Sequence, residues 1–449
     1  MGFCATRVLA LTLAALVAPS ALATWSIVIV NKETKEVGVA SATCLLNFDL
    51  RRFLPVVLVE KGGAAAQSAV DNPIRNRPRI RDGFIAGTDP VQILANLATL
   101  DPAHQSRQYG IVDTLGRAVT FTGTGAGAYA SGLTGEFGNF VYAIQGNVIT
   151  GQEVLDDAEA ALLDPANVDM PAKLMAAMEA AQCRGGDGRC SCTLGTPDAC
   201  EFPPDSCAQM PPPFVRSAHI AFMIVSRRGD TDGTCDGLGC ARGTYFLNFN
   251  IITSVPTTDP VIRLRQLFDP FRAARIGVTD QMASAVQFPS VLPPSASYSR
   301  VMQIELRDWQ GALITGSPTV TVSSDPRDGT NLIGGPFSAT QISPGIYEAT
   351  IPSVATPGAD ILAVRVQDAG FDRILLPTRA VRVLAAGDMN GDGFVSVADI
   401  GPFVLALTDA PQYAIQFPEI VANIVGDFTG DEFLTVGDIS GFVNTLVGG

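Results

Sequence analysis

The chain has 449 residues, of which 47% are hydrophobic and 16% charged, and its formal net charge at pH 7 is −14. This chain is longer than a domain with a single hydrophobic core usually is, so we expect about two to four domains. The acidic balance argues against nucleic acid and anionic membranes as partners.

Residues 1–23 are typical of a secretory signal peptide. Arg7 precedes an apolar run over residues 8–17, and the segment ends in the small-x-small sequence Ala21-Leu22-Ala23. No later run of about 18 apolar residues follows, so we expect no membrane span in the mature chain. We therefore predict a secreted protein, located extracellularly, in the periplasm or at the cell surface.

Cleavage after Ala23 would make Thr24 the first residue, at the head of a β-branched apolar segment. A free α-amine has a pKa of about 8, so a terminal threonine carries a general base beside its own hydroxyl. This is the chemistry of N-terminal-nucleophile (Ntn) hydrolases, and it needs no cofactor. The chain has two histidines, His104 and His219, and this scarcity favours an amine base. The alternative is an exported protein whose first residue has no catalytic role.

Hydrophobic periodicity predicts the elements of the first domain. Strands are expected at residues 24–30, 37–43, 54–60, 109–112, 118–122, 141–145, 218–225 and 244–252. Helices are expected at residues 89–99, 151–163 and 170–181. Two groups of strands, with helices between and after them, predict a layered α+β domain over residues 24–276.

Eight of the nine cysteines follow the signal segment, and seven of these lie between Cys183 and Cys240. An even number in an exported chain favours disulfides in a cysteine-rich insertion at about residues 183–240. A zinc cluster is the competing interpretation, but Cys-x-x-Cys spacing and nearby histidines are missing. Cys44 lies far from the others, and a buried free thiol is an alternative there.

The character of the sequence changes after a linker at residues 277–297. Short alternating runs separated by Gly, Pro and Asp turns predict a β-sandwich of immunoglobulin-like size over residues 298–385. The sequence Gly345-Ile346-Tyr347 before a strand resembles bacterial immunoglobulin-like (Ig-like) modules.

Residues 386–449 contain two copies of a calcium-loop pattern. Oxygen ligands recur at loop positions 1, 3, 5, 9 and 12, with a backbone carbonyl at position 7, and Ca²⁺ prefers such a ligand set. The first copy has Gly393 at position 6, whereas the second has Glu432 there and should bind Ca²⁺ more weakly or not at all. The predicted structural Ca²⁺ ligands are Asp388, Asn390, Asp392, Phe394, Ser396 and Asp399, then Asp427, Thr429, Asp431, Phe433, Thr435 and Asp438. The competing interpretation is a pair of solvated acidic turns.

One apolar helix follows each loop, and position 12 is Asp rather than Glu. These features resemble the dockerin type I module, which is a small helical domain of EF-hand-like loops. The resemblance implies calcium-dependent folding and docking onto a cohesin-like or other cell-surface protein. The spacer between the loops is longer than in typical dockerins.

The first domain resembles the "domain of unknown function 1028" (DUF1028) family, whose fold is similar to the αββα layers of Ntn hydrolases. The resemblance is carried by residues 24–30, 38–43, 67–73, 107–113, 121–123, 142–147, 185–187, 216–218 and 259–267. It implies amide or related acyl hydrolysis by Thr24, with a cell-wall peptide or another small amide as substrate.

The resemblance also implies candidate partners for Thr24. Gly146 and Asn147, with Asn72 or Gln67 nearby, would stabilise the oxyanion. Independently of the resemblance, Lys61 ends a predicted strand and would lower the pKa of the amine, as a basic residue does in proteasome-type sites, or it is a solvated lysine after Glu60. Arg107 and Asp187 would bind a substrate carboxylate or orient the amine, or they belong to structural ion pairs.

Three functions therefore remain open. The first is an exported Ntn-type amidohydrolase held in place by its calcium module. The second is a non-catalytic extracellular scaffold or binding protein. The third is a dockerin-borne component of a polysaccharide-degrading assembly, although no paired-carboxylate glycosidase signature is visible.

Overall fold

The computed structural model describes residues 24–69, 71, 74–192, 216–325, 327, 330–368 and 370–448. The chain divides into two compact units, Met1–Leu267 and Phe268–Gly449, and each is described by itself. Among the described residues, none of the helices combines the length and the apolar character needed to cross a membrane.

Two antiparallel sheets form the centre of the first unit. The six-stranded sheet has the order β10-β9-β2-β1-β8-β7, and the four-stranded sheet has the order β3-β4-β5-β6. The strands of the six-stranded sheet are β1 (Thr24–Asn31), β2 (Val37–Thr43), β7 (Ala130–Phe137), β8 (Phe140–Asn147), β9 (Ile220–Ser226) and β10 (Leu247–Ile251). Those of the four-stranded sheet are β3 (Pro55–Leu58), β4 (Gly62–Ser68), β5 (Arg107–Asp113) and β6 (Ala118–Thr122).

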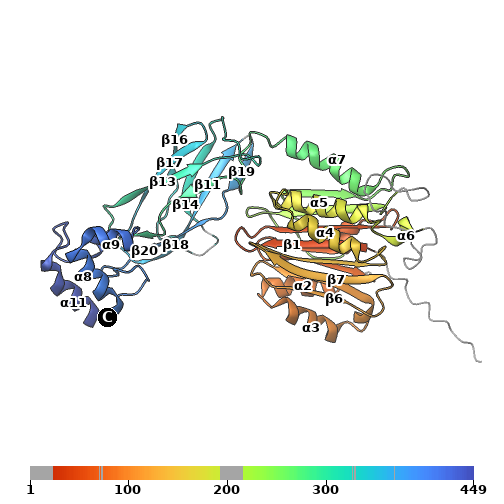
Figure 1. Ribbon diagram of the computed structural model, residues 1–449, viewed down its shortest axis with the longest axis horizontal. Helices are drawn as coiled ribbons and strands as arrows, with labels where there is room; N and C mark the ends of the chain where they lie inside the picture. The colour runs from red at the N-terminus through yellow and green to blue at the C-terminus, as the bar shows by residue number, and fades with distance from the viewer. Residues whose placement is uncertain are drawn as a thin grey trace, which may run out of the picture. The chain divides into compact units, whose positions relative to one another are not determined.

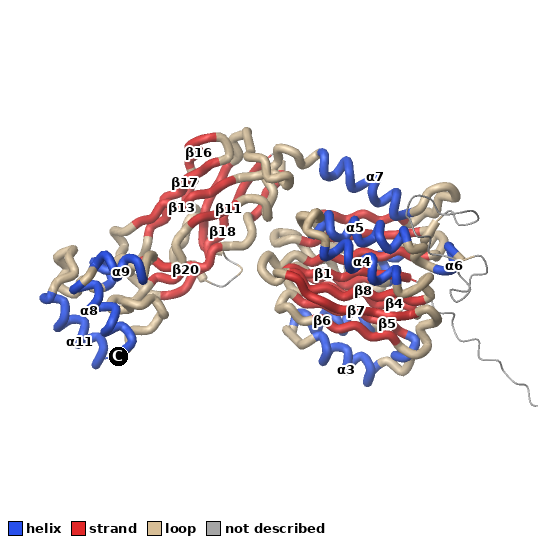
Figure 2. The backbone as a smooth tube through the Cα atoms, in the orientation of Figure 1, coloured by secondary structure: helices blue, strands red, loops and turns tan. Residues whose placement is uncertain are grey.

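Helices cover the outer faces of both sheets (Figures 1 and 2). Helices α4 (Glu153–Leu163) and α5 (Met170–Cys183) lie over the six-stranded sheet, and α2 (Asn76–Ile85) and α3 (Pro90–Leu100) pack on the four-stranded sheet. The shorter elements are α1 (Leu50–Phe53), a 3₁₀ turn η1 (His104–Ser106) and α6 (Gly188–Ser191), and α7 (Pro260–Ala273) spans the boundary between the units. The helices expected at residues 89–99, 151–163 and 170–181 are present as α3, α4 and α5, whereas α2 was not expected.

Strand β1 is buried along its whole length and is paired on both edges, with β2 and with β8. Its side chains alternate between two environments. Ile29 lies beside Leu174 and Met170 of α5, whereas Val28 lies beside Gly63 of β4 in the other sheet. Each apolar side chain buried in this way contributes roughly 1.5–3 kcal/mol. The β-branched, apolar side chains of β1 are therefore buried on both faces of the strand, against α5 on one and against β4 on the other.

Strand β4 consists largely of small residues because it faces β1 closely. A Cβ atom on Gly63 would lie 2.8 Å from Val37 Cγ1 and 3.2 Å from Val28 Cγ1. Larger side chains on this face of β4 would push the two sheets apart, so the small residues Gly63 and Ala65 set the distance between them.

The second unit begins with two sheets that share one hydrophobic core. One sheet contains β11 (Ala285–Gln287), β13 (Ser299–Glu305), β17 (Ile346–Pro352) and β16 (Thr340–Ser343). The other contains β12 (Val291–Leu292), β20 (Arg379–Val383), β18 (Gly358–Asp368), β14 (Thr319–Ser324) and β15 (Phe337–Ser338), with β19 (Phe371–Ile374) paired to β18. Residues 277–297 are therefore not simply a linker, because β11 and β12 pair with later strands.

Helices form the rest of the second unit: α8 (Ile400–Thr408), α9 (Ala410–Gln416), α10 (Ala422–Val425) and α11 (Ile439–Gly448). The 3₁₀ turns η3 (Val397–Asp399) and η4 (Val436–Asp438) precede α8 and α11. Phe403 and Phe442 stack with their ring centroids 4.1 Å apart, and this contact joins α8 to α11. The helix expected after each acidic loop is therefore present.

A buried ion pair in the first unit predicts a measurable loss of stability. Glu36 and Arg227 are 2.7 Å apart, and their side chains are 4% and 1% exposed. Because Glu36→Gln would remove the carboxylate that pairs with the buried Arg227 guanidinium, we expect a loss of about 3 kcal/mol in the free energy of unfolding. The measurement is urea unfolding followed through Trp25 fluorescence in a Trp309→Phe background.

The matched control is Glu136→Gln, which removes the exposed ion pair of Lys32 and Glu136. Exposed pairs contribute about 0–1 kcal/mol. Equal effects of the two substitutions would contradict the assignment of Glu36 to the core.

Candidate functional site

Thr24 lies between the two sheets at the beginning of β1. It is 2% exposed, and its Oγ1 is 3.3 Å from Thr43 Oγ1 at the end of β2. On the other edge of β1, Thr24 is the cross-strand partner of Asn147 in β8. The pairing of β1 with its two neighbours therefore brings Thr43 and Asn147 beside Thr24.

Gln67 reaches Thr24 from the four-stranded sheet. Its Nε2 donates to the Thr24 carbonyl oxygen at 2.9 Å and to Gln108 Oε1 at 2.7 Å. The Ser26 hydroxyl donates to Gln67 Oε1. Asn147 Oδ1 lies 3.5 Å from Gln67 Nε2, so amide groups from both sheets meet at this point.

A buried carboxylate, that of Asp187, is connected to Thr24 through two other side chains. Asp187 is 0% exposed, caps the N-terminus of α6, and accepts a hydrogen bond from the Cys44 backbone amide at 2.6 Å. Arg189 Nη2 is 2.8 Å from Asp187 Oδ2 and donates to Thr43 Oγ1 at 3.3 Å. Asp187, Arg189 and Thr43 thus form a hydrogen-bonded path that ends at the Thr24 hydroxyl.

The structure brings some of the predicted site residues together and leaves others apart. Gly146 lies next to the site, because it pairs with Trp25 and its carbonyl accepts from Gln108 at 2.9 Å. Arg107 forms an ion pair with Asp101 at 2.9 Å and donates to the Ala69 carbonyl at 2.8 Å. These contacts are those of the structural ion pair that was the alternative to substrate binding. Asn72 lies outside the described residues.

Lys61 is not a neighbour of Thr24, and this corrects the expectation that it lowers the pKa of the amine. Lys61 immediately precedes β4, whereas Gln67, which contacts Thr24, is near the other end of that strand. Six residues of extended chain separate them by about 20 Å, too far for a strong effect on the amine.

The expectation of disulfides is confirmed. Cys44 is bonded to Cys190 and Cys235 to Cys240, and Cys183 and Cys192 are also disulfide-bonded. Cys44 is therefore not a free thiol, because the end of β2 lies beside α6. Cys200 and Cys207 lie outside the described residues.

The two histidines have structural surroundings. Burial, with a smaller contribution from Arg216, lowers the pKa of His219, whose Nδ1 contacts Arg216 Nη1 and Ser254 Oγ. Burial lowers the pKa of His104, which stacks on Phe121 with 4.1 Å between ring centroids. His219 lies near Cys44 and Cys190, but the disulfide removes both sulfurs as metal ligands.

Sequence reasoning missed Thr43, Arg189 and Ser26 as parts of the site. The sequence contained the information needed to find Thr43, because a hairpin that pairs Val30 with Val37 must place Thr24 opposite Thr43. The position of Ser26 was also predictable, because alternate residues of a strand lie on one face and Ser26 therefore lies on the same face of β1 as Thr24. Arg189 depends on the position of α6, which no local pattern specifies.

The first acidic loop is organised around its own backbone. Asp388 accepts from Gly391 N at 2.9 Å and from Gly393 N at 3.0 Å, and both glycines have positive φ. Asp399 accepts from Met389 N at 2.7 Å and from Ser396 N at 2.9 Å. Burial raises the pKa of Asp388, and neighbouring carboxylates add to the effect.

The second loop repeats these contacts. Asp427 accepts from Gly430 N and Glu432 N, and Asp438 accepts from Phe428 N and Thr435 N. Both loops offer the oxygen donors that suit Ca²⁺. Among the described residues, however, the three carboxylates of either loop do not converge on one point. Ca²⁺ binding would therefore require these carboxylates to move closer together.

Comparisons with known proteins find one family model that matches part of the N-terminal unit. Residues 24–194 match the model of a family of unknown function, DUF1028. A DUF1028 protein from Silicibacter pomeroyi is 19% identical, with a TM-score of 0.39 over 55% of this chain and 88% of that chain. No curated protein matches the chain.

Two other solved structures are similar to parts of the chain. The Lin-41 filamin domain is 16% identical, with a TM-score of 0.18 over 23% of this chain and 95% of that chain. FdeC, an Escherichia coli adhesin, is 9% identical, with a TM-score of 0.19 over 82% of this chain and 98% of that chain.

Backbone strain in the second loop predicts a stabilising substitution. Glu432 has φ +70, a region that favours glycine, and the equivalent residue of the first loop is Gly393 with φ +96. We expect Glu432→Gly to raise the free energy of unfolding by about 1 kcal/mol. Thermal unfolding of the full chain in calcium-free buffer measures this change.

Glu432→Gln is the control, because it removes the charge but keeps a side chain at positive φ. Equal stabilisation by Gly and Gln would mean that charge repulsion, and not backbone strain, limits this loop.

Proposed function

We propose that the N-terminal unit is an Ntn-type amidohydrolase whose nucleophile is Thr24, exposed by removal of residues 1–23. The observation that carries this proposal is the convergence of Thr43, Gln67 and Asn147 on Thr24 at one end of the space between the sheets. The order of layers, helices, sheet, sheet and helices, supports an Ntn-hydrolase-like αββα fold. The DUF1028 match begins at Thr24 itself.

The proposed reaction is hydrolysis of an amide through an acyl-enzyme. Thr24 Oγ1 attacks the carbonyl carbon while the α-amine accepts the hydroxyl proton. The carbon–nitrogen bond breaks, and the proton passes to the leaving amine. Water then attacks the threonyl ester, and the acid and the free hydroxyl are released.

The surrounding groups divide the remaining tasks. Asn147 and the backbone near Gly146 are the proposed donors to the oxyanion, since Asn147 is fully buried beside Thr24. Gln67 holds the Thr24 carbonyl and so fixes the first residue of the strand. The Asp187–Arg189–Thr43 path orients the hydroxyl.

Substitution of the nucleophile tests this proposal. In protein whose chain begins at Thr24, we expect Thr24→Ala to abolish covalent labelling by a β-lactone probe. Thr24→Ser keeps a hydroxyl and an amine, so it should retain labelling. Mass spectrometry of the intact labelled chains measures both.

Near-ultraviolet circular dichroism serves as the control for folding. If Thr24→Ala is folded and labelled as strongly as the original protein, the scaffold interpretation replaces the catalytic one.

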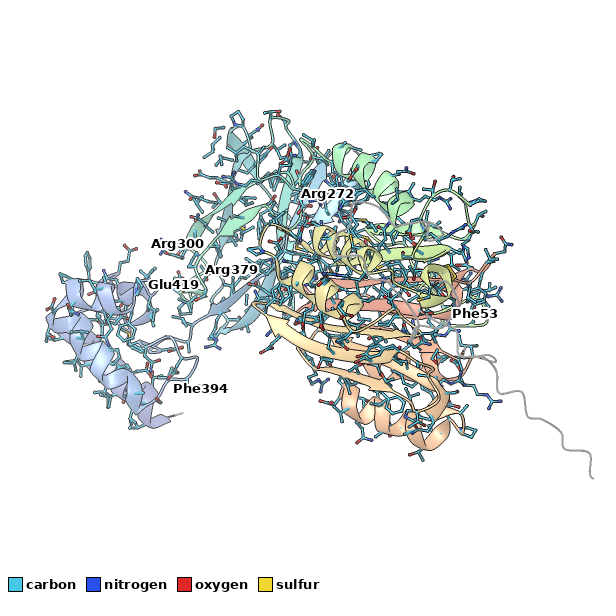
Figure 3. The ribbon with its side chains drawn as sticks, turned by 45° about the vertical axis from the view of Figure 1, so that its right-hand side comes forward. Phe53, Arg272, Arg300, Arg379, Phe394 and Glu419 are labelled. Atoms are coloured by element: carbon cyan, nitrogen blue, oxygen red, sulfur yellow. A yellow bond between two sulfur atoms is a disulfide. The ribbon has the colours of Figure 1, made fainter. Side chains whose placement is uncertain are left out.

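A second proposed function is calcium-dependent docking by residues 386–449. Equivalent apolar side chains are exposed in the two copies of the loop and helix. Phe394, labelled in Figure 3, is 74% exposed, and Phe433 is 63% exposed. Val397 and Val436, which occupy equivalent positions in the two copies, are 80% and 78% exposed. This repeated surface supports a dockerin-like module with a cohesin-like partner, as in polysaccharide-degrading assemblies.

Capture by immobilised cohesins tests the docking proposal. We expect capture in Ca²⁺ and at least tenfold less in chelator, because the loops position Val397 and Val436 for contact. The double substitution Val397→Asp and Val436→Asp should abolish capture, since buried charges at an interface core are costly. Capture that is absent in Ca²⁺, or indifferent to chelator, would contradict the proposal.

A further inference from the structure

The geometry points to a size filter beside Thr24 that admits only a small, uncharged acyl group, about the size of a methyl side chain. This inference rests on the proposed acyl transfer by Thr24 and adds the class of acyl group that it accepts. Acetyl and propionyl amides are the substrates with the required chemistry.

The filter is a small pocket next to the candidate nucleophile. Thr24, Gln67 and Ser68 contribute to its lining. Its other described lining residues are all apolar: Leu45, Phe48, Leu50, Phe53, Leu54 and Ala66. An acyl group attached to Thr24 Oγ1 would therefore meet an apolar surface.

The volume of the pocket limits the size of the group. The volume of this partly open pocket is about 20 Å³. A space of about 10–15 Å³ on this measure holds one water molecule, and a methyl group is of similar size. A longer chain would have to displace Phe48 or Phe53, whose rings stack with 4.5 Å between centroids.

The pocket wall, residues 44–54, is fastened to the rest of the unit at several points. The Cys44–Cys190 disulfide holds its beginning. Asp49 accepts from Asn250 Nδ2, and Arg51 Nη1 donates to Asn248 Oδ1, both at 2.9 Å. These contacts tie the wall to β10.

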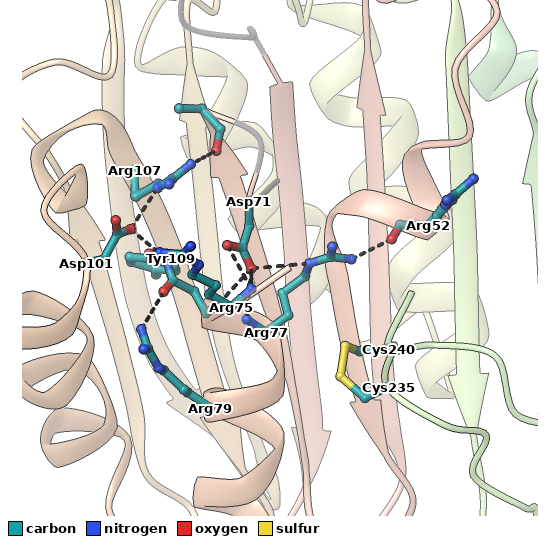
Figure 4. A network of polar contacts seen from close by, with 12 residues as sticks. Arg52, Asp71, Arg75, Arg77, Arg79, Asp101, Arg107, Tyr109, Cys235 and Cys240 are labelled. Atoms are coloured by element: carbon teal, nitrogen blue, oxygen red, sulfur yellow. Dashed lines mark hydrogen bonds and ion pairs between the residues drawn. A yellow bond between two sulfur atoms is a disulfide. The ribbon is translucent and has the colours of Figure 1, made fainter. Parts of the chain in front are cut away.

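A buried arginine holds the far end of the wall. Arg77 is 2% exposed and donates to the Arg52 carbonyl at 2.5 Å, while Asp71 lies 3.9 Å from its Nε (Figure 4). Burial lowers the pKa of Arg77 to about 10, so the side chain stays charged at neutral pH. Because the wall is held at both ends, widening the pocket would break several of these contacts at once.

The chemistry of the lining excludes charged acyl groups. Among the described lining residues none is charged, and the polar groups are already engaged. Gln67 bonds to Thr24 and Gln108, and the Ser68 hydroxyl donates to the Ala126 carbonyl at 3.4 Å. A succinyl or glutamyl carboxylate would be buried there without a counter-ion.

The test is a series of acyl-p-nitroanilides offered to protein whose chain begins at Thr24: acetyl, propionyl, butyryl, hexanoyl and succinyl. We expect kcat/KM to fall by about tenfold or more for each methylene beyond propionyl, and no turnover of the succinyl compound. Phe53→Ala should raise the ratio of kcat/KM for hexanoyl over acetyl by at least tenfold. The ratio is taken within one variant, so the amount of folded protein cancels.

Phe137→Ala is the matched control, because Phe137 is also a partly buried, stacked phenylalanine but lies at the other end of β7 from the partner of Asn147. It should leave the ratio unchanged. A preference for hexanoyl or succinyl that still requires Thr24 would overturn the size filter and leave the proposed hydrolase standing. An unchanged ratio in Phe53→Ala would also overturn the filter. Failure to cleave every compound, with no labelling of Thr24, would overturn both proposals.

Discussion

The first unit depends on a single strand, β1, which is buried on both faces and hydrogen-bonded on both edges. Such a strand cannot shift by one residue, because the shift would exchange the side chains that face α5 with those that face β4. The position of Thr24 follows from this constraint. Its side chain must lie between the sheets, opposite Thr43 and Asn147.

The space between the sheets changes character along β1. Near Val28 and Val30 it is filled by aliphatic side chains from both sheets. Near Thr24 and Ser26 it is lined by hydroxyl and amide groups. Burying polar groups is costly unless they are paired, and folded proteins concentrate such costs at functional sites.

Gln145 illustrates the cost. It is the cross-strand partner of Ser26 and is 0% exposed. Neither atom of its side-chain amide has a hydrogen-bond partner among the described residues. Gln145 therefore places a further buried amide at the polar end of the space between the sheets.

Local patterns predicted the elements that carry strong periodicity. The strands of the six-stranded sheet with β-branched residues and the helices α3, α4 and α5 were expected near their observed positions. Strand β4 was not among the expected strands, because its glycine and alanine residues have weak strand propensity and serve close packing between the sheets. Helix α2 contains Pro78 and three arginines and lacks a clear apolar stripe.

The candidate site was predictable only in part, for a physical reason. Thr24 and Asn147 were named from their motifs, and strand pairing brings them together. Lys61 was named because it ends a strand, but the direction of β4 places that end away from Thr24. The Asp187–Arg189 pair acts on Thr43 through α6, and the disulfide that fixes α6 cannot be deduced from cysteine spacing.

The central claim is that Thr24 becomes the first residue of the working protein. N-terminal sequencing of the protein recovered from an exporting host tests it most directly. We expect a single sequence beginning Thr-Trp-Ser-Ile. A mature chain that begins at any other residue would contradict it, because Thr24 would then have no free amine.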